Sequence, residues 1–224
     1  HGPHLPVNTD VVIGAHFLAA LDQIDPEAQL ILPPVKVGCS AHHLDFDGTL
    51  SVPHRVMMDY VCSILDSVCG GGFRNILLFN SHGGNQGIGQ VILEDFGAAN
   101  PDCRIAMVTW WTLAQDALAE LSKAGRFGTG HACEFETSLM MAAGAIEPNI
   151  DLPTGEFFVP SHGWADGSML HKSVGALFRS IRKISGGSGV VGQPDIANVE
   201  QGHKITTAVV RRLETVVTDL RWMG

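Results

Sequence analysis

A short apolar run followed at once by a glycine-rich turn is the feature that most constrains the fold. Residues 75–80 read Asn-Ile-Leu-Leu-Phe-Asn, and Ser-His-Gly-Gly-Asn follows at 81–85. A continuous apolar run of this length is typical of a strand buried on both faces of a parallel sheet. The paired glycines mark a tight turn into a helix that apolar spacing predicts over 86–96. We therefore expect an α/β protein with a mostly parallel sheet.

The other segments fit a single three-layer α/β/α domain over residues 1–224. Apolar spacing predicts a strand at 103–110, and a second candidate at 30–37 is interrupted by Pro33-Pro34. Ser51 is expected to cap the second helix, with Pro53 in its first turn. The Gly/Ser/Pro-rich stretch 151–192 is expected to be irregular, as a lid or an oligomer contact. Further helices are predicted at 11–21, 51–68, 136–145 and 199–220.

Composition and charge exclude several classes of protein. The net charge is −9 with no dense basic stripe, so a nucleic-acid partner is not expected. No apolar run reaches the roughly 18 residues of a membrane helix, so no membrane partner is expected. The cysteines are Cys39, Cys62, Cys69, Cys103 and Cys133. Their odd number and wide spacing predict free thiols rather than disulfides or a zinc knuckle. With no visible secretory signal, a cytoplasmic protein is expected.

The first ten residues carry a candidate set of metal ligands. His1, His4 and Asp10 lie in a stretch stiffened by prolines. Imidazole and carboxylate groups suit Zn, Mn and Fe, and a bridging carboxylate can hold two cations about 3.5–4 Å apart. A surface loop with incidental histidines is the alternative. The chain opens without Met, so we expect that a preceding segment is missing.

A second cluster lies where the first strand ends. His82 follows that strand directly, and ligands of open α/β sheets bind at the carboxyl ends of strands. Gly83 and Gly84 let a substrate approach the backbone closely, and Asn85 can orient either His82 or the substrate. A glycine-rich turn with a helix-capping Asn is the alternative. His42 and His43 lie in a predicted polar loop, where a solvent-facing role is favoured over substrate contact.

A third cluster contains His131, Glu134 and Glu136. In a helix, the first two would share one face, and Glu136 would point elsewhere. A His–Glu pair beside a metal suits proton transfer, although acidic residues are also ordinary at a solvated helix start. Three such clusters in one short chain together predict a hydrolytic metal site.

These motifs, taken in order, resemble the creatininase (creatinine amidohydrolase) family. The matching blocks are residues 1–6, 9–10, 46–51, 80–85, 131–138 and 189–194. The resemblance implies an α/β/α fold around a mostly parallel sheet. It also implies two divalent metal ions and a homo-oligomer, with a hexamer as one form.

The resemblance also implies roles for single residues. It places His1 on one metal, Asp10 between both metals and His82 on the other, with His131 as a proton donor or base. Two ligands of creatininase itself have no counterpart: a Glu two residues before His1, and a Glu at the position of Gly84. We expect Glu134 as the replacement ligand. Phe-Asp-Gly-Thr at 46–49 also departs from the family's Phe-Pro-Gly-Thr, which argues against creatinine as the substrate.

The expected activity is hydrolysis of a C–N bond in a small cyclic amide or formamide by metal-activated water. Zn or Mn, with Fe as a further option, would activate the attacking water, while His131 and Glu136 would be catalytic. Trp110 and Trp111 are expected to line the substrate pocket, with core packing the alternative for Trp110.

Three other functions are alternatives to this activity. The first is a non-catalytic ligand-binding or assembly protein on the same fold, because fold alone does not determine function. The second is a hydrolase of a carbocyclic sugar ketone or lactone. The third, a Rossmann-type nucleotide binder, is disfavoured because no G-x-G-x-x-G follows a strand.

Overall fold

The main sheet of the protein is a pair of parallel strands, β1 (Asn75–Asn80) and β2 (Arg104–Thr109). Asn75 pairs with Arg104 and Asn80 with Thr109, so both strands end at the same edge. At that edge Asn80 Nδ2 donates a hydrogen bond to Thr109 Oγ1 at 3.1 Å. The computed structural model describes residues 1–157, 159–160, 162–171 and 173–222.

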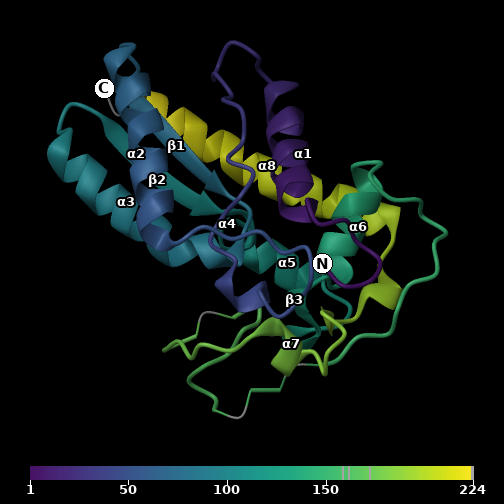
Figure 1. Ribbon diagram of the computed structural model, residues 1–224. Coiled ribbons are helices and arrows are strands. Elements are labelled where there is room, and N and C mark those ends of the chain that lie inside the picture. Colours follow the sequence, from purple (N-terminus) through teal and green to yellow (C-terminus); the bar gives the residue numbers. More distant parts are fainter. Residues whose placement is uncertain (158, 161, 172, 223–224) are drawn as a thin grey trace.

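Side chains of β1 alternate between two hydrophobic cores, which makes three layers (Figure 1). Leu77 and Phe79 pack against a core formed mainly by α1, α6 and α8. Ile76 and Leu78 pack against α2 and α3 on the other face. The helices are α1 (Thr9–Asp22), α2 (His54–Gly70), α3 (Gln86–Ala99), α6 (Glu134–Ala142) and α8 (Val199–Trp222).

A second small sheet brings the C-terminal third of the chain to α6. Strand β3 (Thr129–His131) pairs antiparallel with β4 (Val191–Gly192). The shorter helices are α4 (Trp110–Leu113), α5 (Gln115–Leu121) and α7 (Ile181–Ile184), and 3-10 turns occur at η1 (Ala41–His43), η2 (Gly83–Asn85), η3 (Arg126–Gly128) and η4 (Pro194–Ile196). Among the described helices, none combines the length and the apolar character needed to cross a bilayer.

The α/β/α architecture and the parallel strand pair are confirmed, but two local predictions are wrong. Residues 30–37 form no strand; Leu30 and Leu32 are exposed, and the two prolines remove the N–H groups that a sheet ladder needs. Ser51 does not cap α2, which begins at His54 after Pro53. The Ser51 hydroxyl instead accepts a hydrogen bond from the Ser40 backbone N–H at 2.9 Å.

The prediction that all five cysteines are free thiols is wrong for two of them. Cys69 and Cys103 form a disulfide with a Cα–Cα distance of 6.8 Å. Cys69 lies in the last turn of α2, just before β1, and Cys103 directly precedes β2. Parallel pairing of the two strands brings their starts together, and therefore brings these two cysteines together. Cys39, Cys62 and Cys133 are free.

Candidate active site

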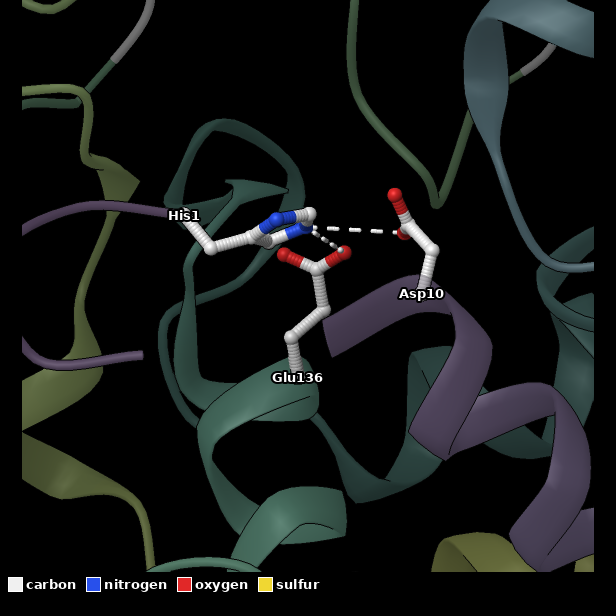
Figure 2. Close-up of side chains that lie close together, drawn as sticks. All are labelled: His1, Asp10 and Glu136. Atoms are coloured by element: carbon white, nitrogen blue, oxygen red, sulfur yellow. Dashed lines mark ion pairs between the residues drawn. The ribbon is translucent and has the colours of Figure 1, made fainter. Parts of the chain in front are cut away.

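Two side chains of the first ten residues meet Glu136 from far along the chain (Figure 2). His1 Nε2 lies 3.5 Å from Asp10 Oδ1 and 3.6 Å from Glu136 Oε1. One ligand atom from each residue lies within 4.8 Å of the others. Asp10 belongs to the first turn of α1 and Glu136 to the first turn of α6. Helix N-termini favour negative charge, so both helices stabilise the carboxylates that they present.

Asp10 lies between two imidazole rings and directs one oxygen to each. Its Oδ2 is 2.9 Å from His82 Nδ1, while its Oδ1 faces His1. The other ring nitrogen of His82, Nε2, is 3.2 Å from the Cys39 carbonyl oxygen. A carbonyl only accepts hydrogen bonds, so Nε2 carries a proton, and Nδ1 can either donate a second proton to Asp10 or bind a cation in its place. This is the arrangement of a carboxylate that can bridge two cations.

The electrostatics of this group favour positive charge at its centre. Burial alone would lower the pKa of His1, but the charges of Asp10 and Glu136 raise that pKa to about 10. For Asp10, burial would raise the pKa, but His1 and His82 hold it well below its usual value. The pKa of His82 is raised in spite of its burial, mainly through its hydrogen bond to Asp10. A proton is one cation that this field stabilises, and a divalent metal ion is another.

Three buried imidazole nitrogens in this region have no hydrogen-bond partner among the described residues. They are Nε2 of His1, Nδ1 of His4 and Nε2 of His131. Burying a polar atom without a partner costs free energy, so such atoms call for an explanation. A cation beside His1 and its two facing carboxylates would give the His1 nitrogen a partner. The imidazole and carboxylate donors that converge here suit Zn and Mn.

His131 lies in β3 rather than in a helix, which corrects the expectation that it shares a helix face with Glu134. Its Nδ1 is 2.8 Å from the Gly189 carbonyl oxygen, so Nδ1 carries the proton and donates it there. The His131 ring centre is 4.4 Å from that of His1. Burial lowers the pKa of His131 well below its ordinary value. The ring is therefore neutral, with a free lone pair on Nε2.

Glu134, the expected ligand, is not brought to this group. Its side chain is fully buried, and its carboxylate accepts hydrogen bonds from Ser122 Oγ at 2.6 Å and from Gln201 Nε2 at 3.2 Å. Glu136 stands two residues further along α6 and faces His1 instead, while its other oxygen accepts from the Ala132 N–H. Residues two apart on a helix do not face the same side. The expected orientations of the two carboxylates are thus reversed.

Of the expected substrate-binding residues, Asn85 holds a loop in place, whereas Trp110 and Trp111 belong to the hydrophobic core. The Asn85 side-chain carbonyl accepts a hydrogen bond from the Cys39 N–H at 2.9 Å and so holds residues 39–43 against η2. Trp110 is fully buried, with its ring centre 5.6 Å from that of Phe17, which makes it a core residue. Trp111 packs on the same core. Gly83 and Gly84 form the turn directly after His82.

His42 and His43 lie in the 3-10 turn η1 and reach the candidate site, although sequence reasoning favoured a solvent-facing role for them. The His43 ring centre is 4.5 Å from that of His131 and 5.9 Å from that of His82. No periodic pattern surrounds these residues. The adjacent His-His pair, in a loop between two apolar segments, was the only available signal.

Comparisons with known sequences match this chain to one family of proteins. A family model described as creatinine amidohydrolase matches residues 1–217. The 3-dehydro-scyllo-inosose hydrolase of Thermotoga maritima is 25% identical over 247 residues, covering 98% of this chain and 74% of that protein. The mycofactocin precursor peptide peptidase of Mycobacterium tuberculosis is 26% identical over 237 residues, covering 100% of this chain and 81% of the relative.

Solved structures carry the same fold. A Bacteroides fragilis protein assigned to the creatinine amidohydrolases superposes with a TM-score of 0.81 at 22% identity, over 99% of this chain and 85% of that one. Creatininase structures of Zn–Zn and Mn types superpose with TM-scores of 0.75 and 0.76 at 20% identity; each covers 98% of this chain, and 85% and 86% of theirs.

Proposed function

The chain belongs to the creatininase family of amidohydrolases, and on that premise we propose that it hydrolyses a C–N bond of a small cyclic amide or formamide with the help of two divalent metal ions. We assign the metals to His1, Asp10, His82 and Glu136, with Glu136 in place of Glu134. Zn or Mn is the proposed metal. The cytoplasmic location, the homo-oligomer and the single-domain span of residues 1–224 remain predictions.

One observation carries this proposal. A buried imidazole nitrogen of His1 faces two carboxylates at 3.5 and 3.6 Å, and these groups come from the N-terminal segment, α1 and α6. Two carboxylates this close repel each other unless a positive charge lies between them. The shared Asp10, with His82 on its second oxygen, supports a second cation beside the first. When bound, such ions acidify a water molecule and polarise a carbonyl group.

The residues around the metals have separable tasks. Asp10 and Glu136 supply negative charge from the N-termini of rigid helices. The Cys39 carbonyl fixes the tautomer of His82, as carbonyl partners commonly do for ligating imidazoles. The Gly189 carbonyl holds the His131 ring with Nε2 unprotonated. His131 is thus prepared to accept a proton during attack by water and to return it to the leaving nitrogen.

A second candidate reaction is hydrolysis of a carbocyclic sugar ketone or lactone. The hydrolase of 3-dehydro-scyllo-inosose matches 98% of this chain, and its name describes a substrate without a scissile amide. The same carboxylate and imidazole groups can serve either reaction, since both begin with attack of water at a carbonyl carbon.

Metal removal and reconstitution test the proposal. Chelation should abolish hydrolysis across a screen of small cyclic amides, formamides and lactones, and added Zn or Mn should restore it. His82→Ala should lose bound metal, whereas the same substitution at exposed His203 on α8 should leave the metal content unchanged. Full activity without metal would end this mechanism. A metal-loaded protein that is inactive on every substrate would favour the non-catalytic alternative.

A further inference from the structure

The loop before α2 packs closely against the turn after β1. A Cβ atom at Gly84 would lie 2.7 Å from His82 Nε2 and 2.8 Å from His42 Cε1, and it would overlap the Cys39 carbonyl oxygen. Real Cβ atoms essentially never approach other atoms so closely, so no side chain can enter from position 84. The ring of His42 occupies that space. The Asn85 side chain, hydrogen-bonded to the Cys39 N–H, holds this close approach in place.

His42 and His43 together cover one side of the candidate metal group. Their ring centres are 4.2 Å apart. His42 stacks on His82 with centres 5.6 Å apart and an interplanar angle of 17°, and His43 lies 4.5 Å from His131. Both rings are partly exposed, and within the described residues no hydrogen bond occupies their nitrogens. They are therefore available to a molecule that reaches the site from solvent.

The chemistry of this pair is neutral and bifunctional. The ordinary pKa of an imidazole is near 6.5, so each ring is mainly uncharged near pH 7 and offers one N–H donor and one acceptor nitrogen. Arg182 of α7 reaches the same loop, where its guanidinium donates a hydrogen bond to the Asp45 carbonyl oxygen at 2.7 Å. A hydroxyl group complements each imidazole ring, because it can accept from the N–H and donate to the other nitrogen.

We propose that His42 and His43 form a recognition wall for the hydroxyl groups of a polyhydroxylated cyclic substrate whose ring carries the reactive carbonyl. This inference rests on the proposed hydrolytic function and narrows its substrate class. It makes His42 and His43 specificity-determining residues rather than metal ligands. Position 84 contributes only the space that His42 fills.

Calorimetric binding to the metal-loaded protein tests the wall with two probes, a polyhydroxylated cyclohexanone and cyclohexanone itself. The variants are His42→Phe and His43→Phe, which keep a planar ring but remove its nitrogens. His203→Phe, at an exposed position on α8, is the matched control. His43→Asn, which retains one donor and one acceptor, tests for rescue. Metal content is measured for every variant.

The wild type and the control should bind the hydroxylated ring at least tenfold more tightly than cyclohexanone. Each Phe variant should weaken binding of the hydroxylated ring about fivefold, the typical effect of one neutral hydrogen bond, and leave cyclohexanone binding and metal content unchanged. His43→Asn should recover part of the loss. Equal binding of the two rings by the wild type, or equal weakening of both rings in the Phe variants, overturns the proposal.

The same measurements distinguish failure of the wall from failure of the proposed function. A protein that binds metal and hydrolyses amides, but does not prefer the hydroxylated ring, contradicts the wall alone. A protein that prefers the hydroxylated ring and loses that preference in the Phe variants, but hydrolyses no amide, supports the wall and contradicts the C–N reaction.

Discussion

Replacing Glu134 and Glu136 separately by Gln distinguishes a carboxylate that holds the fold from one that holds a cation. Glu134 accepts from Ser122 Oγ, from the Lys123 N–H at 3.1 Å and from Gln201 Nε2. Gln201 cannot turn its amide without cost, because its own oxygen accepts from Ser138. In Glu134→Gln the new NH2 group faces hydrogen-bond donors, so one or two charge-assisted hydrogen bonds to the carboxylate are lost. At about 1.5–3 kcal/mol each, the expected loss of unfolding free energy is about 3 kcal/mol.

Glu136→Gln should have the opposite effects on stability and on metal binding. Its amide oxygen can still accept from the Ala132 N–H, so the metal-free protein should lose little stability. The negative charge beside His1 disappears, however, and the affinity for metal should fall sharply.

Thermal unfolding of the metal-free proteins and metal analysis of the loaded proteins measure the two effects. Glu134→Gln should lower Tm by about 6–12 °C for a chain of this length and keep its metal. The two substitutions are chemically identical, and both sites lie buried in the first turn of α6, so each variant controls for the other. A Glu134→Gln protein that unfolds normally but has lost its metal would refute the assignment.

Three further predictions concern the loop, its histidines and the disulfide. The folded-state pKa values of His42 and His43 lie below the unfolded value near 6.5, so the unfolded chain binds more protons and stability should fall as pH drops from about 6.5 toward 4 and then 3. Tm of metal-free protein should therefore depend less on pH in His43→Phe than in the wild type. Gly84→Ala should destabilise by about 1–3 kcal/mol in urea unfolding, because its methyl group overlaps the neighbouring backbone; an unchanged midpoint would contradict that contact. Thiol titration of the unreduced, unfolded chain should find three thiols rather than five, since Cys69 and Cys103 are paired.

Much of the architecture could be read from local patterns. The apolar run of 75–80 predicted β1, and the spacing of 86–96 predicted α3, because strand and helix periodicities are properties of short segments. The place of His82, directly after a buried strand, was also sufficient to predict a site at that edge of the sheet. His1 and Asp10 were assigned to the same site from residue chemistry and family resemblance, and the structure brings them together.

Other features depended on contacts between distant segments. Which of Glu134 and Glu136 faces His1 depends on the rotation of α6 about its axis, and α6 packs with α1 and α8 in one core. The burial of Trp110 depends on packing against Phe17 of α1, far away in sequence.

The amino-acid sequence alone determined the longer helices α1, α2, α3, α6 and α8, the parallel strand pair and the kinds of ligand present, since these follow from local periodicity and side-chain chemistry. Only the tertiary structure selected Glu136, paired Cys69 with Cys103 and brought His43 beside His131. Each of these outcomes depends on the rotation and separation of segments that local preferences do not specify.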